Sequence, residues 1–307
     1  MFSRLNRILP VLLLTAVLVL AACGGPASQT DDEAGGKPTI TIGSKNFTEQ
    51  LLIGEMYALL LEEEGFPVNR SLNLGGTLVA HEALVAGEID LYPEYTGTGL
   101  LNMLNLEVMK DHQEVYAAVK EGYQEQWDLV WLDPAPMNNT QAIAVTAETA
   151  EKYDMYTLSV MSEVAPELVM AAVPEFTERP DGLPGLQEVY GGFEFKEIKL
   201  VDYGIKYRAL INGDADVTVA FGTDGEIAGY GLVVLEDDKG LWPPYQVAPV
   251  VRQDLLDQAP EVADILNRVQ GLLTDDTMQA LNWEVDGNQR EYAEVAEEFL
   301  REQGLID

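Results

Sequence analysis

Short strand-like runs alternate with helix-like segments along most of this chain, and that alternation narrows the folds open to it. Residues 39–42 form a β-branched run that ends at Gly43, and residues 51–64 then carry apolar side chains at helical spacing. Residues 68–74 and 78–86 repeat the same pattern. Because short strands joined through helices form mainly parallel sheets that are covered on both faces, an α/β fold is predicted.

The rest of the chain continues this pattern and ends in helix-like sequence. The tail from 260 to 305 reads as helical, with 275–282 and 291–304 as candidate helices. A chain body of this length fits two α/β lobes better than one uninterrupted sheet. Further strands are predicted at residues 89–92, 129–132, 142–145, 168–173, 198–201, 217–220, 232–235 and 247–251.

Residues 1–22 are predicted to be a secretory signal peptide. Arg4 and Arg7 precede the apolar run 8–20, which is short for a membrane span of about 20 residues. The run leads into Cys23 through small residues, and this sequence resembles the lipobox of bacterial lipoprotein precursors. That resemblance implies cleavage before Cys23 and diacylation of its sulfur, which would give a stable membrane anchor.

Residues 23–37 follow the predicted cleavage site and read as a flexible tether. They are small and polar, contain Pro26 and show no hydrophobic periodicity. The alternative for this end of the chain is a plain signal peptide in which Cys23 falls by chance.

The charge of the chain excludes several classes of function. Asp and Glu number 52 against 18 Lys and Arg, which gives a formal net charge of −34. Because cationic side chains neutralise phosphates, this composition argues against nucleic-acid binding. The single Cys and the two His, His81 and His112, leave little for a metal centre. No metal and no cofactor is therefore expected.

No catalytic motif stands out along the chain. The nucleophile-elbow pattern, the P-loop, the zinc-binding H-E-x-x-H and the C-x-x-C pair are all missing from the sequence. Carboxylates are so frequent that some pair will lie close together by chance. An extracellular hydrolase that uses paired carboxylates therefore ranks far below a binding protein.

Three loops carry polar and aromatic residues where an α/β sheet presents its ligand: residues 44–50, 92–99 and 241–245. In the first loop, Asn46 with Glu49 three residues later predicts a capping box, and Lys45 favours an anion such as a carboxylate. Tyr95 and Tyr245 lie in the other two loops. Together with Lys45 or Arg179 they could hold a zwitterion by both ends, with the rings facing the cation.

These loops and several further segments resemble the substrate-binding lipoproteins of osmoprotectant ABC transporters. The similarity runs from about residue 39 to 305 and is closest to the glycine betaine and proline betaine binders, with carnitine and choline binders as near relatives. The segments are 43–50 (GSKNFTEQ), 75–77 (GGT), 92–98 (YPEYTGT), 138–140 (NNT), 174–184 (PEFTERPDGLP), 235–240 (LEDDKG), 243–245 (PPY) and 278–282 (MQALN).

The resemblance implies the two-lobed α/β type II periplasmic-binding-protein fold, with ligand held in the cleft between the lobes. Lobe 1 would comprise residues 38–142 and 248–307, and lobe 2 would comprise 143–247. Two crossover strands would act as the hinge between the lobes, at the apolar runs 142–145 and 247–251.

The resemblance also implies a set of ligand-binding residues. Tyr95 and Tyr245 would belong to an aromatic cage around a quaternary ammonium, a cation with no N–H donors that gains from π faces. Lys45, the Thr98 hydroxyl and Arg179 would hold the carboxylate end. Because Arg179 would come from the second lobe, ligand would bridge the lobes and favour their closure.

This chain departs from the betaine-binding pattern at two cage positions. Gln141 stands where related proteins carry Tyr, and it supplies hydrogen bonds in place of a ring. Phe221 also replaces a Tyr, so it keeps a π face and loses a hydroxyl. Each ring missing from the cage would weaken trimethylammonium binding by roughly 0.5 to 2 kcal/mol.

The resemblance predicts an extracytoplasmic receptor, lipid-anchored through Cys23, that delivers glycine betaine or a related quaternary ammonium to an ABC permease and its ATPase. It implies a monomer without catalytic activity. The main alternative keeps the fold and changes the ligand to another zwitterion, such as an amino acid or ergothioneine, as Gln141 would permit.

Overall fold

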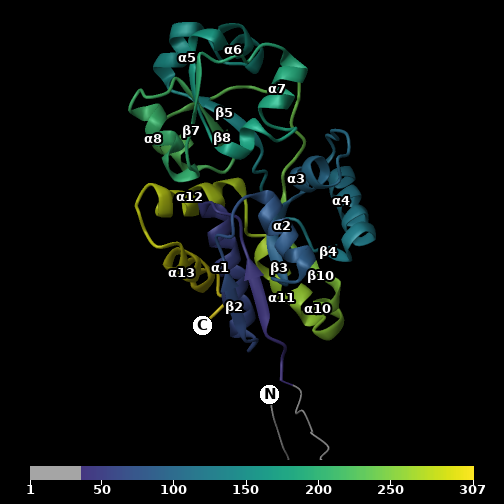
Figure 1. Ribbon diagram of the computed structural model, residues 1–307. Coiled ribbons are helices and arrows are strands. Elements are labelled where there is room, and N and C mark those ends of the chain that lie inside the picture. The colour runs from purple at the N-terminus through teal and green to yellow at the C-terminus, as the bar shows by residue number, and fades with distance from the viewer. Residues whose placement is uncertain (1–35) are drawn as a thin grey trace, which may run out of the picture. The chain divides into compact units, whose positions relative to one another are not determined.

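The computed structural model describes residues 36–307, and residues 37–307 form two α/β lobes, each built on one five-stranded sheet (Figure 1). The predicted signal peptide 1–22, Cys23 and nearly all of the predicted tether lie outside the described residues. The predicted two-lobed α/β architecture is confirmed.

The first sheet has the strand order β2-β1-β3-β10-β4 and forms the centre of lobe 1. Strands β1, β2 and β3 run parallel, while β10 lies antiparallel between β3 and β4. The strand bounds are β1 Ile40–Gly43, β2 Val68–Ser71, β3 Leu91–Tyr95, β4 Leu129–Trp131 and β10 Val247–Arg252.

The second sheet repeats this plan in lobe 2 with the strand order β7-β6-β8-β5-β9. Strands β6, β7 and β8 are parallel, and β5 lies antiparallel between β8 and β9. Each sheet therefore contains one antiparallel strand among its central positions. The strand bounds are β5 Gln141–Val145, β6 Val169–Ala172, β7 Glu197–Leu200, β8 Val217–Phe221 and β9 Val233–Val234.

The two runs expected to cross between the lobes each lie within a single sheet instead. The run 142–145 belongs wholly to β5 in lobe 2, and 247–251 belongs wholly to β10 in lobe 1. The chain crosses just before each of them, between β4 and β5 and again between β9 and β10. Both antiparallel strands are thus the first strand that the chain forms after it changes lobe.

Helices cover both sheets and bury a large apolar core. Helix α1 packs in lobe 1 against α11, α12 and α13, far later in the chain. Tyr57, Tyr92 and Trp131 are among the largest fully buried side chains. The longer helices are α1 Thr48–Glu63, α2 Thr77–Ala86, α4 His112–Trp127, α7 Leu183–Tyr190, α11 Glu261–Gln270, α12 Asp275–Asp286 and α13 Tyr292–Glu302.

Shorter helices connect the strands of both lobes. They are α3 Thr96–Thr98, α5 Ala147–Tyr153, α6 Leu158–Val164, α8 Lys206–Ile211, α9 Gly225–Gly229 and α10 Gln253–Gln258, with single turns at Ala165–Glu167, Pro174–Thr177 and Tyr203–Ile205 and a π-helical turn at Gly99–Met103. Across residues 36–307, no helix has the length and apolar character needed to cross a membrane.

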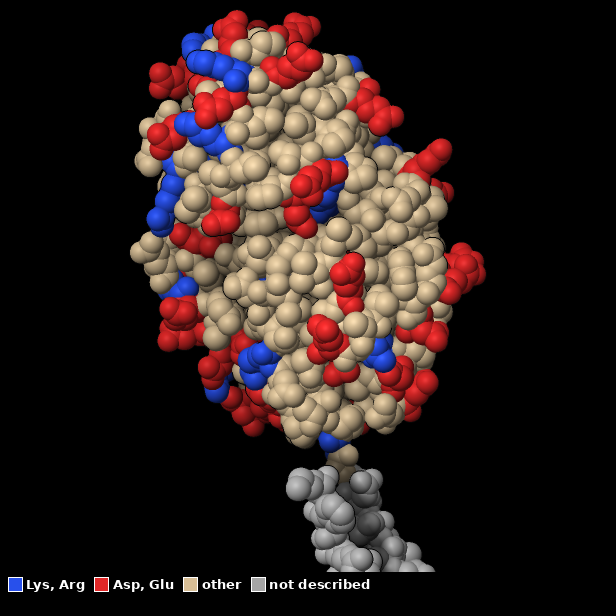
Figure 2. Space-filling model, viewed as in Figure 1, with Lys and Arg blue, Asp and Glu red and all other residues tan. Residues whose placement is uncertain are grey.

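Acidic side chains are spread over both lobes on the face shown in Figure 2, with Lys and Arg scattered among them. The large negative charge is thus a property of the solvated surface. A neutral zwitterion would be steered little by this field.

Candidate functional site

A cavity between the two lobes brings together all seven residues that the resemblance assigned to ligand. They are Lys45, Tyr95, Thr98, Gln141, Arg179, Phe221 and Tyr245. The cavity has a volume of about 30 Å³, enough for one or two water molecules, so a larger ligand has to move its walls apart. That these residues contact a ligand stays a prediction.

The strand ends explain why these residues meet. Lys45 follows β1, Tyr95 is the last residue of β3 and Phe221 is the last residue of β8, so all three lie at the carboxyl ends of parallel strands. Gln141 begins β5 and Tyr245 precedes β10, the antiparallel strands whose starts face the same edges. In α/β sheets this edge is where ligands bind.

Four further residues line the cavity that the sequence did not single out: Phe47, Thr77, Asn139 and Tyr203. The signal available for three of them was their place in the segments 43–50, 75–77 and 138–140, which contain Phe47, Thr77 and Asn139. Tyr203 stands alone in a short turn after β7 and belongs to no motif.

The added rings turn the site into a stack of aromatic faces. The Phe47 ring lies 5.2 Å from that of Tyr203, 6.2 Å from that of Tyr95 and 6.4 Å from that of Phe221, all stacked. The Tyr203 and Phe221 rings are 6.0 Å apart. Phe47 and Tyr203 thus add two rings to the wall of the cavity that Gln141 also lines, and the weaker binding expected from the missing cage ring stays a prediction.

Tyr245 lines the cavity and is held in place by Asp181 and Gly97. Its hydroxyl donates to Asp181 Oδ2 at 2.5 Å, and its ring packs directly over Gly97. A Cβ at position 97 would lie 2.7 Å from two ring carbons of Tyr245, so only glycine leaves room for this packing.

The positive charge of Lys45 is compensated by the Glu94 carboxylate. Its ammonium donates to Glu94 Oε1 at 2.6 Å, and both side chains are buried. Burial lowers the pKa of Lys45, and the Glu94 carboxylate opposes that effect. Because an ammonium has three donors, Lys45 can still offer hydrogen bonds to an anion in the cavity.

Arg179 is likewise paired, through a two-point ion pair with Asp181. Its Nε donates to Oδ1 at 2.8 Å and its Nη2 to Oδ2 at 2.6 Å. The same guanidinium reaches the hydroxyls of Thr98 at 3.4 Å and Thr77 at 3.5 Å on the other lobe. Burial alone would raise the pKa of Asp181, but the Arg179 guanidinium lowers it to about 2.

Glu175 connects the lobes at the N-terminus of α2. Its Oε1 accepts a hydrogen bond from the Thr77 backbone N–H at 2.7 Å, and its Oε2 accepts one from the Tyr203 hydroxyl at 3.2 Å. A carboxylate is favoured there because the first N–H groups of a helix lack partners. A Cβ at Gly76 would lie 2.2 Å from Glu175 Oε1, so glycine at this position permits the contact.

The Gln141 amide is engaged within the protein. It is 4% exposed, and its Nε2 donates to the Asp181 backbone carbonyl at 3.1 Å. This bond and the Tyr245 hydroxyl bind opposite ends of Asp181, so Gln141 supports the Arg179 ion pair as well as lining the cavity.

The capping box expected at the start of α1 does not form. Phe47 occupies the N-cap position and makes no side-chain cap, and Asn46 is exposed. Glu49 instead points away from its own helix terminus and accepts bonds from distant segments, including the Tyr95 hydroxyl at 2.7 Å. A local sequence pattern could not anticipate this arrangement.

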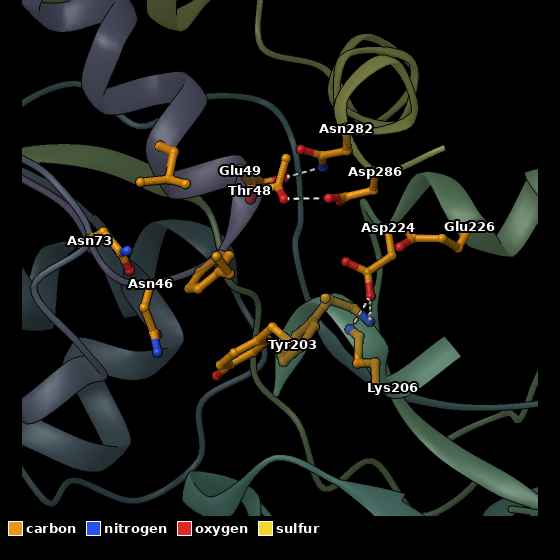
Figure 3. A pocket seen from close by; sticks show the side chains of 14 residues that line it. Asn46, Thr48, Glu49, Asn73, Tyr203, Lys206, Asp224, Glu226, Asn282 and Asp286 are labelled. Carbon is orange, nitrogen blue, oxygen red and sulfur yellow. Dashed lines mark hydrogen bonds and ion pairs between the residues drawn. The ribbon is translucent and has the colours of Figure 1, made fainter. Parts of the chain in front are cut away.

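A second cavity of about 210 Å³ lies beside the first and shares Phe47, Tyr203 and Phe221 with it (Figure 3). Lys206 donates to Asp224 at 2.6 Å, and its ammonium lies 4.5 Å from the Phe221 ring centroid. The Phe221 ring thus contacts the Lys206 ammonium and also lines the first cavity.

Glu226 in this second cavity is expected to make stability depend on pH. Burial and the charges of Asp224 and Asp286 raise the pKa of Glu226 to about 7. Since the unfolded carboxyl titrates near pH 4.3, ionising Glu226 costs folding free energy as the pH rises from about 4 to 7. At pH 8, the free energy of unfolding of Glu226→Gln should therefore exceed that of wild type by roughly 1–3 kcal/mol. At pH 4 the two proteins should be about equally stable.

Denaturant unfolding at the two pH values tests this expectation. Glu302→Gln, at an exposed position of α13, is the matched control and should change stability little at either pH. An equal gain for Glu226→Gln at pH 4 and pH 8 would point to packing as the cause, contrary to the titration argument.

The described residues offer no metal centre that would change this chemistry. Within residues 36–307, no group of three or more His, Cys, Asp or Glu side chains is placed to hold a metal ion. His81, which the sequence assigned to a helix, is buried in α2 and packs edge-on against Trp127.

Comparisons with known proteins find relatives along nearly the whole chain. Residues 38–302 match the family model described as the substrate-binding domain of ABC-type glycine betaine transport systems. The carnitine transport binding protein OpuCC of Listeria monocytogenes is 35% identical over 310 residues, covering 100% of this chain and 99% of that protein. The glycine-betaine-binding protein of Pseudomonas aeruginosa is 37% identical over 279 residues, covering 88% and 89%.

Solved structures extend the likeness to three dimensions. A structure described as a glycine betaine/carnitine/choline ABC transporter superposes with a TM-score of 0.71 at 33% identity, covering 87% of this chain and 100% of that one. Lactococcal OpuAC in its closed form with glycine betaine superposes with a TM-score of 0.64 at 14% identity, covering 87% and 96%, which shows a shared fold.

Proposed function

Since the chain belongs to the family of substrate-binding domains of ABC-type glycine betaine transport systems, we propose that its interlobe cavity captures a quaternary-ammonium osmoprotectant. Substrate-binding proteins of ABC importers work outside the cytoplasm. The proposed ligand is glycine betaine or a close relative, bound with its cation against the ring stack.

The stack of Phe47, Tyr95, Tyr203 and Phe221 is the observation that carries this proposal. A quaternary ammonium has no N–H to donate and is cheaply desolvated, so aromatic faces suit it better than hydrogen-bond acceptors do. The hydroxyls of Thr98 and Thr77, beside Arg179 and Lys45, would receive the carboxylate end of a zwitterion.

Calorimetric titration tests the proposal directly. Glycine betaine, proline betaine, carnitine, choline and ergothioneine form the panel, and at least one should bind saturably. Glycine, which lacks the three methyl groups, is the matched control and should bind far more weakly than glycine betaine. Silence toward all five compounds would sink the quaternary-ammonium assignment.

Asn139 favours a second candidate within the same fold, a zwitterion that carries hydrogen-bond donors. Its Oδ1 is buried and lacks a partner among residues 36–307, and the residue lines the cavity. A ligand N–H or O–H would satisfy this acceptor. A relative at 33% identity over 88% of this chain is the ergothioneine transport protein EgtU of Helicobacter pylori, of which the match spans 48%.

We further propose the cellular setting of this receptor. A lipid on Cys23 would anchor it to the bacterial membrane, where as a monomer it would deliver ligand to an ABC permease and its ATPase. It would perform no chemistry of its own. Labelled fatty acid incorporated by wild type and not by Cys23→Ser would support the anchor, and equal labelling would contradict it.

A further inference from the structure

Glu49 is a buried carboxylate without a cationic partner. The residue is 2% exposed, yet none of the ion pairs formed among residues 36–307 includes it. Burying an unpaired charge is costly, so such a group calls for an explanation.

Four neutral donors surround this carboxylate. Its Oε1 accepts from the Tyr95 hydroxyl and from Asn139 Nδ2, both at 2.7 Å. Its Oε2 accepts from the Thr223 hydroxyl and, at 3.1 Å, from Asn282 Nδ2. Figure 3 shows Glu49 at the start of α1 facing Asn282 of α12. Burial raises the pKa of Glu49, and the hydrogen bonds that it accepts oppose this effect. Two oxygens that accept four hydrogen bonds suit an ionised carboxylate, which has no proton to donate.

The neighbouring buried carboxylates differ from Glu49 in having cations. Glu94 is paired with Lys45 and Asp181 with Arg179, each at 2.6 Å. Of these three buried carboxylates, Glu49 alone has no cation paired with it.

Two of the groups that Glu49 orients are walls of the cavity, Tyr95 and Asn139. A tyrosine that donates to an anion carries more electron density on its ring, which strengthens attraction for a cation over the ring face. The Asn139 amide must turn its Nδ2 to the carboxylate, so its Oδ1 is left without a protein partner among the described residues. Both effects make the cavity wall more negative.

We propose that Glu49 is a positioning residue that makes the cavity select a positively charged headgroup, supplying the counter-charge from behind the cage. This inference rests on the proposed function and deepens it, because it names a fixed charge as the source of selectivity. The aromatic faces alone would accept a neutral group of the same shape through their apolar area. Glu49 would distinguish the cation from its neutral isostere.

The experiment compares choline with 3,3-dimethylbutan-1-ol, in which carbon replaces the quaternary nitrogen. Wild type should bind choline at least about 30-fold more tightly than the neutral isostere. In Glu49→Gln this ratio should fall by about tenfold, because the amide keeps the size of the side chain and removes its charge. A purely structural role would weaken both probes equally and leave the ratio unchanged.

Two further variants sharpen the comparison. Glu49→Asp keeps the charge and should retain most of the ratio even if both affinities fall. Glu302→Gln removes a carboxylate at an exposed position of α13 that lines neither cavity, and it should leave the ratio near that of wild type. An unchanged ratio in Glu49→Gln, or an equal drop in Glu302→Gln, would overturn the proposal.

If Glu49→Gln does not fold, the proposal can still be tested on wild type, through the ratio of its affinities for choline and for the neutral isostere. Equal binding of choline and the neutral isostere by wild type would contradict the role of Glu49 alone. Binding of neither probe, together with silence toward the titration panel, would contradict the proposed function itself.

Discussion

Replacing Arg179 with alanine is expected to weaken glycine betaine binding by about 100-fold and choline binding by less than about fivefold. Among residues 36–307, Arg179 is the one guanidinium that lines the cavity, and it reaches Thr98 and Thr77 on the opposite lobe. Glycine betaine has a carboxylate for this group to bind, whereas choline has a hydroxyl in its place. The loss should therefore depend on the ligand.

A second variant separates this effect from damage to the site. Arg179→Ala leaves Asp181 buried without its cation, which costs stability, while the Tyr245 hydroxyl keeps Asp181 as its acceptor. Combining it with Asp181→Asn removes the stranded charge, and the double variant should recover stability without recovering betaine affinity. Calorimetry and thermal unfolding measure both quantities. Equal losses for betaine and choline would show that Arg179 acts only through structure.

Removing two rings of the stack at once should have an effect of similar size. Phe47→Ala with Tyr203→Ala takes away two π faces, each contributing roughly 0.5–2 kcal/mol, so affinity for any quaternary ammonium should fall by about fivefold to nearly a thousandfold. Unlike the Arg179 variant, this one should weaken choline and glycine betaine alike. Calorimetric titration of both ligands measures the outcome.

Controls decide whether the aromatic character of these residues matters. Phe47→Leu keeps apolar bulk without a π face, so it should bind less tightly than wild type; undiminished affinity would contradict a cation–π role. Tyr230→Ala removes a ring that is 41% exposed, packs on Trp283 and lines neither cavity, and it should leave affinity unchanged.

The strands were predictable because their signal is local. Each of the ten strands within residues 36–307 falls on a run that the sequence indicated, often within a residue or two, since short β-branched runs bounded by turn residues carry that information. Helix α4 was harder to predict. Asp111 caps its N-terminus, but most of its residues are polar. Its buried residues are Val115, Val119 and Tyr123, which form only a narrow apolar stripe.

The site residues divide in the same way. Tyr95, Thr98 and Arg179 lie in long motifs and could be assigned from the sequence by resemblance. Tyr203 belongs to no motif and reaches the cavity only because two lobes, built from separated stretches of chain, bring their strand ends together. No spacing rule along the sequence encodes that meeting.

Glu49 shows most clearly where prediction from the sequence stops. Its position three residues after Asn46 fits a capping box, and that local explanation is complete in itself. In the fold its partners lie 46 residues away at Tyr95 and 233 residues away at Asn282. Only the tertiary structure shows that the carboxylate lacks a cation.

The hydrogen bonds that join the two lobes directly would affect how fast a bound ligand is released. Glu175 binds the Thr77 N–H, Asp181 accepts from Asn102, and Thr223 donates to Glu49, each bond linking one lobe to the other without a ligand atom. A trapped molecule would leave only after these bonds break, so its residence time would be set by opening of the lobes. We therefore expect handover to depend on a partner that competes for these contacts and speeds the opening.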